Sequence, residues 1–392
     1  MPAPTNPNIL ATFPPPVMEA LRWLDGLHFP ADRPLINVSQ AAPAAPPPLE
    51  MRQAISDIVL NDDGAHLYGP DLGLPALRRE LANQWSRAYC GNVRPDQIAI
   101  TSGCNQAFCA AITSLAQAGD EIILPTPWYF NHKMYLEMNG ITAVPLATDQ
   151  TLLPDPALAQ RLITERTRAI VLVTPNNPAG VEYPAQLVRA FYDLAKSSGI
   201  ALIIDETYRD FAARDQAPHR LFSDPGWPDT LIQLYSFSKS YRLTGHRIGA
   251  MTTSQSRLVQ VEKYIDSVTI CPNQIGQRAA LWGMQNMSHW LAGERCEILK
   301  RRQAIEEGFA RLRGWRLLGL GGFFAYVEHP FDIPSDELAP HLVRKAGILL
   351  LPGSFFKPAQ DPSAKRELRI AFANIDTVGI ASLFSRLENL NL

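Results

Sequence analysis

The sequence predicts an α/β fold, in which a mostly parallel sheet is sandwiched by helices and is followed by a smaller C-terminal α+β domain. Between residues 49 and 267, apolar strands alternate with helical segments, and polar side chains stand where three strands end: Lys239, Asp205 and Asn177. The chain has 392 residues, 46% hydrophobic and 19% charged, which suits about two domains with a large core. Because open α/β sheets bind ligands beyond the carboxyl ends of their strands, we expect a site there.

The composition along the chain predicts three parts. Residues 1–48 are rich in proline and alanine, which favours an extended N-terminal arm that packs with the small domain. Residues 49–280 form the expected large domain, and residues 281–392 the small one. Across this second limit, the proline-free residues 274–313 predict a long helical connection, and apolar strands are expected over residues 321–327 and 368–372.

Lys239 is the most informative residue of the chain. It follows an apolar strand, residues 231–235, and stands between the hydroxyl side chains of Ser238 and Ser240. Burial of an unpaired ammonium is costly and lowers its pKa, which supplies the neutral amine that imine chemistry needs. Since most lysines are exposed, a solvated loop lysine is the alternative, and the neighbouring motifs decide against it.

Two further strand ends supply those motifs. Apolar residues 201–204 lead to Asp205, whose carboxylate can keep a pyridinium nitrogen protonated and so make the ring an electron sink. The alternative role for Asp205 is to cap the next helix. Residues 170–174 lead to a turn that contains Asn177 and Pro178, and such turns also have a purely local explanation.

A phosphate site is expected where a strand, a tight turn at Gly103 and an apolar helix start follow one another. The unpaired N–H groups and the dipole of a helix N-terminus attract anions. Gly103 allows close approach of the backbone, and the N–H groups of Cys104 and Asn105 are the expected donors. Together with Ser236 and Arg247, they predict a cradle with three sides.

Taken in chain order, these motifs resemble the pyridoxal-phosphate-dependent aminotransferases of class I/II, with fold type I, from about residue 37 to residue 373. The resemblance implies a seven-stranded sheet in a cofactor-binding large domain and a Schiff base between Lys239 and the cofactor aldehyde. It makes Lys239, Asp205 and Tyr208 catalytic, with Asp205 on the pyridinium and Tyr208 on the ring oxygen. The residues that it assigns to the cofactor are Tyr68, Gly103, Cys104, Asn105, Tyr129, Asn177, Asp205, Tyr208, Ser236, Ser238, Lys239 and Arg247.

The same resemblance implies an aromatic side chain stacked on the cofactor ring. Alignment on Asn131 and His132 selects Tyr129 for this position, and Trp128 is the alternative. Asn177 matches the family asparagine whose amide donates to the ring oxygen and which also contributes to the substrate site.

Arg369 is the expected substrate clamp. It is a single guanidinium in an otherwise apolar strand and matches the family arginine that binds the substrate α-carboxylate, a task for which its planar fork is suited. The alternative is an edge-strand arginine that faces water. Tyr68 matches the family tyrosine that reaches the cofactor phosphate of the neighbouring subunit, which implies a homodimer with shared active sites.

The expected function is transamination between an α-amino acid and a 2-oxo acid, the two substrates, through the Lys239 Schiff base. The same residues also serve α,β-lyases and decarboxylases. A regulator domain that resembles aminotransferases would need a DNA-binding helix-turn-helix, for which the proline-rich first 48 residues leave no room. Family members that prefer dicarboxylates bring an arginine to a position that falls near Asp266; this chain has none there, so apolar or aromatic donors are expected over aspartate.

Composition argues against several other classes. The net charge of -2 gives no signal for nucleic acid or membrane surfaces. The five cysteines have no Cys-x-x-Cys spacing and the eight histidines form no motif, so neither a disulfide framework nor a metal site is expected. We find no signal peptide and no run of about 20 apolar residues. The expected location is the cytoplasm.

Overall fold

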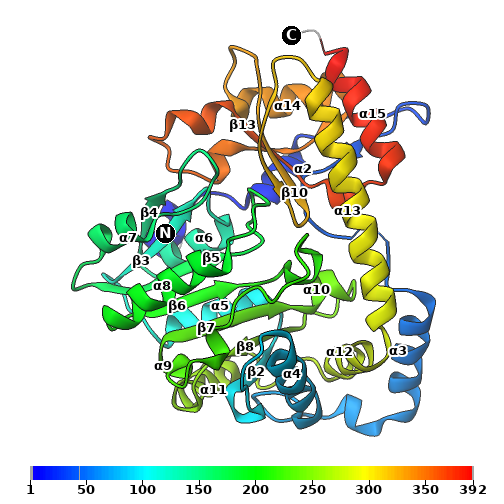
Figure 1. Ribbon diagram of the computed structural model, residues 1–392. Coiled ribbons are helices and arrows are strands. Elements are labelled where there is room, and N and C mark those ends of the chain that lie inside the picture. The colour runs from blue at the N-terminus through cyan, green and yellow to red at the C-terminus, as the bar shows by residue number, and fades with distance from the viewer. Residues whose placement is uncertain (1–2, 44, 391–392) are drawn as a thin grey trace.

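The computed structural model describes residues 3–43 and 45–390, and its central element is a sheet of seven strands in the order β2-β8-β7-β6-β5-β3-β4 (Figure 1). β8 is antiparallel to both of its neighbours, whereas the other pairs are parallel, so the expected mostly parallel sheet is confirmed. The strands are β2 (Ile98–Thr101), β3 (Glu121–Thr126), β4 (Thr142–Ala147), β5 (Thr167–Val173), β6 (Ala201–Asp205), β7 (Leu231–Ser236) and β8 (Gly249–Thr252).

The register of the parallel strands aligns their carboxyl ends. Val173 of β5 lies opposite Asp205 of β6, and Asp205 lies opposite Leu234 of β7. The Thr174 N–H donates to the Asp205 carbonyl at 3.0 Å, just beyond the end of β5. The three polar strand ends that were predicted from the sequence therefore lie along one edge of the sheet.

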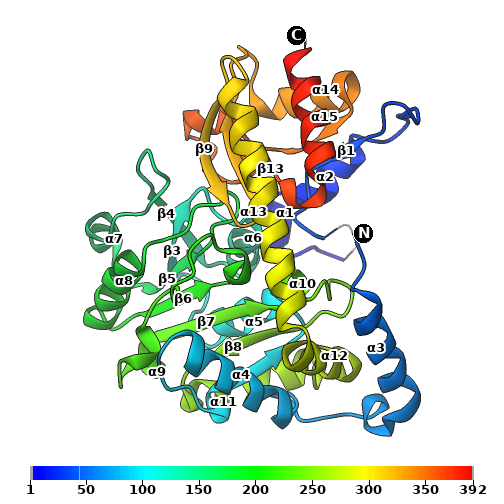
Figure 2. The ribbon, with the colours of Figure 1, turned by 45° about the vertical axis from the view of Figure 1, so that its right-hand side comes forward.

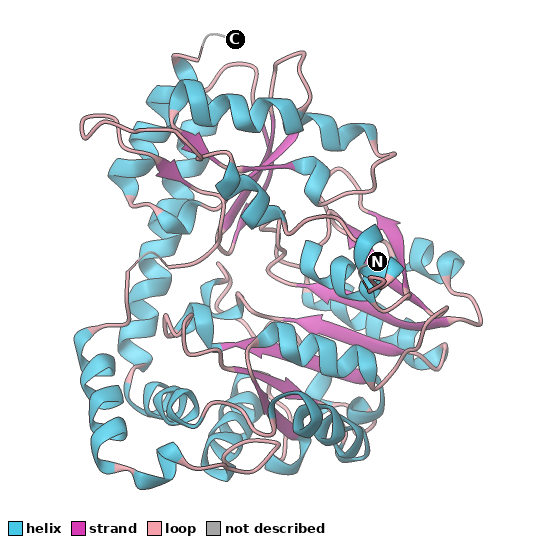
Figure 3. Cartoon of the chain, turned by 180° about the vertical axis from the view of Figure 1, so that it is seen from behind, coloured by secondary structure: helices cyan, strands magenta, loops and turns pink. Residues whose placement is uncertain are grey.

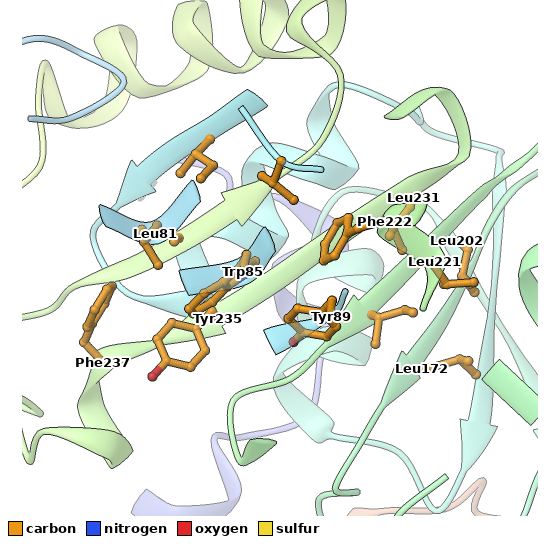
Figure 4. Packing of buried hydrophobic residues seen from close by; sticks show 14 of the residues in the cluster. Leu81, Trp85, Tyr89, Leu172, Leu202, Leu221, Phe222, Leu231, Tyr235 and Phe237 are labelled. Carbon is orange, nitrogen blue, oxygen red and sulfur yellow. The ribbon is translucent and has the colours of Figure 1, made fainter. Parts of the chain in front are cut away.

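Helices cover both faces of this sheet. Successive residues of β6 point to opposite faces, where Leu202 and Ile203 belong to two different apolar clusters, as expected for strands buried on both sides. Figure 4 shows part of one cluster, with Trp85 near Tyr235. The helices are α4 (Pro75–Ala88), α5 (Cys104–Thr113), α6 (Phe130–Met138), α7 (Pro156–Leu162), α8 (Ala185–Ser197), α9 (Trp227–Thr230), α10 (Phe237–Ser240), α11 (Gln255–Thr269) and α12 (Gln274–Asn286).

A second, antiparallel sheet has the order β12-β13-β10-β9 and lies apart from the first one (Figure 3). Its strands are β9 (Arg316–Gly321), β10 (Phe324–Glu328), β12 (Leu351–Pro352) and β13 (Glu367–Ile370), and its helices are α13 (Ser288–Arg311), α14 (Ser335–Ala346) and α15 (Thr377–Glu388). The strand expected over residues 321–327 is present as β10 from Phe324 onward, whereas Gly321 ends β9, because Gly321 and Gly322 turn the chain between the two strands.

The helical connection over residues 274–313 consists of two helices. α12 ends at Asn286 and α13 begins at Ser288, with Met287 between them in a non-helical conformation. Figure 2 shows α13 running from beside the large sheet to the small one. Within residues 3–43 and 45–390, no helix combines the length and the apolar sequence that crossing a membrane requires.

Among the first 48 residues, those that the structure describes (3–43 and 45–48) are less extended than expected. They contain α1 (Pro7–Ala11) and α2 (Pro16–Arg22), which both begin with proline, a residue that is favourable at the first helical position. α3 (Leu49–Asn61) follows. β1 (Ile36–Asn37) pairs in parallel with β11 (Ile348–Leu349), so this segment contacts the C-terminal part of the chain. The domain limits at residues 48 and 280 stay a prediction.

Candidate active site

A cavity of about 410 Å³ opens at the carboxyl ends of β5, β6 and β7. It brings together most of the site residues that were predicted from the sequence. Gly103 is not part of the lining but directly precedes Cys104, which is. The predicted residues that line it are Cys104, Asn105, Tyr129, Asn177, Asp205, Tyr208, Ser236, Ser238, Lys239, Arg247 and Arg369.

Lys239 enters this cavity from the short helix α10, which begins immediately after β7. The Ser236 hydroxyl accepts a hydrogen bond from the Ser238 N–H at 3.3 Å and so caps the helix. Burial, with the positive charges of Arg247 and Arg369, lowers the pKa of Lys239 from 10.5 to about 8. The Lys239 amine donates to the Ala41 carbonyl at 2.6 Å. The lysine is therefore held in place and loses its proton readily.

Asp205 lies at the end of β6 and is almost fully buried. Its Oδ1 accepts from the Thr207 hydroxyl at 2.7 Å and the Thr207 N–H at 3.0 Å, and Cys104 Sγ lies 3.6 Å away. Its Oδ2 lies 3.4 Å from His132 Nε2. Burial raises the pKa of Asp205, but the hydrogen bonds from His132 and Thr207 outweigh that effect, and the pKa lies below its ordinary value. The carboxylate is therefore ionised at neutral pH.

The alternative role of Asp205, to cap the next helix, is only partly consistent with the structure. Its bonds to Thr207 close a local turn, but the next helical turn, Arg209–Phe211, begins after Tyr208 and receives no side-chain cap. Sequence reasoning missed both His132 and Thr207 as partners of Asp205. The Asp-x-Thr spacing is a signal for the turn, whereas His132 reaches Asp205 from α6, far away in the sequence.

His132 is held in position by aromatic packing. Its ring stacks on Phe108 of α5 with centroids 3.9 Å apart and packs edge-on against Tyr129. Tyr129 lines the cavity, and its hydroxyl accepts from the Asn131 amide at 2.8 Å. The alternative residue, Trp128, is buried and is absent from the described lining of this cavity. This arrangement favours Tyr129 as the residue that covers a ring bound in the cavity.

The predicted cradle lies at the N-terminus of α5. Gly103 has a φ of 88°, and a side chain there would collide with the Arg247 guanidinium. A Cβ at Gly249 would lie 2.6 Å from the Cys104 nitrogen. Arg247 donates to the Ser238 hydroxyl at 3.3 Å. The glycines therefore keep a guanidinium beside the N–H groups of the first helical turn, which have no acceptor within the helix. These donors fit a phosphate group.

Arg369 lies in the middle of the small sheet rather than at its edge, and it is only 2% exposed. Its guanidinium donates to the Asn177 side-chain oxygen at 3.0 Å and to the Ser39 carbonyl. Nε has no hydrogen-bond partner among the described residues. Burial lowers the pKa of Arg369 to about 10. The alternative of an arginine that faces water is wrong, and the buried, unpartnered donor fits a carboxylate ligand.

Two more predicted residues complete the wall. Because the Asn177 oxygen accepts from Arg369, its amide nitrogen is left to donate to a ligand. Tyr208 packs against the aromatic side chains of Phe323 and Phe324, and burial raises the pKa of its hydroxyl well above 10. Tyr208 therefore stays protonated and can donate. The donors and the ring-covering tyrosine together fit pyridoxal phosphate.

Tyr68 is the predicted residue that the structure does not bring to this cavity. It is 81% exposed and does not belong to the lining of the cavity in its own chain. The next residue, Gly69, donates its N–H to Cys271 Sγ at 3.4 Å, which attaches this loop to the segment after α11.

Comparisons with known proteins agree with this geometry. The family model "Aminotransferase class I and II" matches residues 33–387. The aromatic aminotransferase ISS1 of Arabidopsis thaliana is 27% identical over 87% of this chain and 86% of its own length. A probable aspartate/prephenate aminotransferase of Thermus aquaticus is 28% identical over 75% of this chain and 77% of its own.

Solved structures show the same fold. The methionine aminotransferase YbdL of Escherichia coli superposes with a TM-score of 0.89, covering 99% of this chain and 100% of its own at 22% identity. A single mutant of the Thermus thermophilus aspartate aminotransferase has a TM-score of 0.87 with 99% of each chain covered at 23% identity. The family uses pyridoxal phosphate, so the expected cofactor is confirmed, as is aminotransferase activity. The chain belongs to the class I and II aminotransferases.

Proposed function

We propose that this aminotransferase moves the amino group between an α-amino acid and a 2-oxo acid with pyridoxal phosphate attached to Lys239. The observation that carries the proposal is the convergence, around one cavity, of an easily deprotonated lysine, an ionised aspartate and a glycine-built anion cradle. When bound, the cofactor supplies an electron sink for the electrons left at the substrate α-carbon.

Lys239 is the proposed proton carrier at the α-carbon. A pKa of about 8 makes the neutral amine and the ammonium nearly equal in free energy at working pH, which suits a group that accepts a proton and later returns it. Asp205 keeps its negative charge at the end of β6, where the partners on Oδ1 and Oδ2 fix its orientation. Its proposed task is to hold a proton on the ring nitrogen.

Arg369 is the proposed clamp for the α-carboxylate of both substrates. Asn177 and the Ser39 carbonyl fix the plane of the guanidinium, and the unpartnered Nε is a donor for a substrate oxygen. A fixed fork limits rotation of the substrate and so presents the Cα–H bond to Lys239.

Arg369→Leu is expected to raise KM for all amino donors by a similar factor, roughly 10- to 150-fold, because a charge-assisted hydrogen bond contributes about 1.5–3 kcal/mol. The measurement is KM for several donors with a fixed 2-oxo acid, and oxo-acid formation is followed by chromatography. Arg313→Leu, at an exposed loop position, is the matched control. An unchanged KM would show that Arg369 does not bind the α-carboxylate. Absence of oxo-acid product from every donor with the unaltered protein would contradict transamination.

A homodimer with shared sites is the proposed assembly. Tyr68 and Leu67 are 81% and 66% exposed, unusual for two adjacent large apolar residues, and Val268 at the end of α11 is 58% exposed. The contact between Gly69 and Cys271 places these two segments side by side. A second copy of the chain would cover this surface. Tyr68 of the first copy would then lie at the phosphate cradle of the second copy.

Hybrid dimers test the shared site. Mixing the Arg369→Leu and Tyr68→Phe variants is expected to restore activity, because one of the two sites in a hybrid then carries neither substitution. The measurement is transaminase activity after subunit exchange, with hybrid formation checked by differential tagging. If hybrids form and activity does not recover, Tyr68 acts within its own chain.

A further inference from the structure

We infer that the amino donor carries a neutral, extended apolar side chain, of the chemistry of methionine or phenylalanine, and that helix α2 forms the wall that receives it. The donor class depends on the proposed transamination and adds to it. The relatives named above differ from one another in activity, so the inference rests on the cavity alone.

The wall comes from the N-terminal segment. Val17 and Leu21 stand one turn apart on α2 and, with Met18, line the same cavity as Lys239 and Arg369. Met18 is 53% exposed, so its side chain is free to contact a ligand. Apolar surface at the mouth of a cavity is stabilised when an apolar ligand covers it.

The position of α2 is fixed by packing. Ala20 is fully buried in an apolar cluster with Val343, Leu349 and Leu351 of the small domain, and Val17 and Leu21 pack against the same cluster. Phe130, at the start of α6, belongs to the same cluster and also lines the cavity. The cluster therefore ties the donor wall to the small domain, which also carries Arg369.

Each charged side chain that lines the cavity already has a proposed role. Among the described residues, its charged lining consists of Asp205, Lys239, Arg247 and Arg369, which serve the ring nitrogen, the proton transfer, the phosphate and the α-carboxylate. A second carboxylate in the donor would find no free cation here. Desolvating an unpaired carboxylate is costly, so aspartate and glutamate are disfavoured.

Neither α2 nor the end of α11 supplies such a cation. Arg22 is the single cation of α2; it pairs with Glu19 at 2.8 Å and does not line the cavity. The last four residues of α11, from Asp266 to Thr269, contain no arginine or lysine. A donor with a cationic side chain is equally disfavoured, since Asp205 is the cavity's single anion in the described part of the chain.

A donor series tests the inference. With the holoenzyme and one 2-oxo acid, kcat/KM for methionine or phenylalanine is expected to exceed that for alanine and aspartate by about 10- to 100-fold, since hydrophobic pockets discriminate to this extent. If no donor yields an oxo acid, the proposed function itself fails. If aspartate or alanine is converted as well as methionine, transamination stands and the inferred donor class is wrong.

A charge placed on α2 gives the sharper test. Met18→Arg is expected to raise kcat/KM for aspartate relative to methionine by about tenfold or more, because it supplies the missing cation at an exposed position. Leu10→Arg, on α1 and 70% exposed but outside the cavity lining, is the matched control and should leave the ratio unchanged. Calorimetry with two unreactive ligands should show the same preference. The unaltered protein is expected to bind 3-phenylpropionate more tightly than succinate, and Met18→Arg is expected to reduce this difference in affinity. If Met18→Arg changes neither the kcat/KM ratio of aspartate to methionine nor the relative affinities of the two unreactive ligands, α2 does not form part of the donor site.

Discussion

Lys239→Ala is expected to lower the turnover number by at least about 10²- to 10⁴-fold, the usual contribution of a positioned proton carrier. The residual cavity keeps its anion cradle and Arg369, so substrate and cofactor can still bind without covalent attachment. The measurement is kcat under saturating cofactor. Lys263→Ala, at an exposed position on α11, is the matched control and should retain full activity. Retained turnover in the Lys239 variant would contradict its role.

The lowered pKa of Lys239 gives this prediction a pH dependence. Only the neutral amine attacks an aldehyde, so attachment of the cofactor should accelerate as pH rises, be half-maximal near the Lys239 pKa of about 8 and level off above it. A lysine with the ordinary value of 10.5 would still be accelerating at pH 9. Borohydride reduction and peptide mapping should place the label on Lys239, and label on another lysine would overturn the assignment.

The two arginines that flank Lys239 show how the parts of the site depend on one another. The proposed role of Arg247 and Arg369 is to bind anions, but their positive charges also destabilise the Lys239 ammonium. Anions that bind to these arginines weaken that effect, so the proton affinity of the lysine should rise when phosphate and carboxylate groups occupy the site. The lysine is then better able to accept a proton when the substrate is in place.

The sequence was sufficient to predict the strand-end residues because each is encoded locally. Asp205 ends its apolar strand, and Asn177 and Lys239 closely follow theirs. The apolar strands leave the register little freedom, and parallel strands bring their carboxyl ends to one edge. Gly103 likewise predicts a close backbone approach, since its left-handed backbone conformation excludes most side chains.

The remaining contacts depend on packing between distant segments. The Ala41 carbonyl beside Lys239 and the Ser39 carbonyl beside Arg369 come from the N-terminal segment, whose proline content predicted an extended arm. Proline at the first helical position starts a helix as readily as it prevents one further on. Single-sequence patterns therefore could not place Met18 of α2 in the cavity, nor His132 against Asp205.

Asp205→Asn is expected to retain the cofactor but to lower single-turnover rates by about 10²- to 10³-fold, the range observed when one preorganised electrostatic group is removed. Asparagine keeps an oxygen that can accept from Thr207, so the local turn survives. It lacks the negative charge that makes protonation of the ring nitrogen favourable. The charge of Asp205 itself is present above its lowered pKa and is lost as pH falls through that value, so titration of Asp205 should not change the rate of the unaltered protein across the neutral range.

The measurement is the single-turnover rate with one saturating donor, together with the thermal unfolding midpoint of each variant. Asp193→Asn, which removes a half-exposed partner of Arg189 on α8, is the matched control, and surface pairs of this kind contribute little to stability. A similar unfolding midpoint with a strongly reduced rate would separate the electrostatic role from a structural one. If the rate stays near that of the unaltered protein, Asp205 serves only the turn with Thr207, and the protonated ring nitrogen must depend on another group.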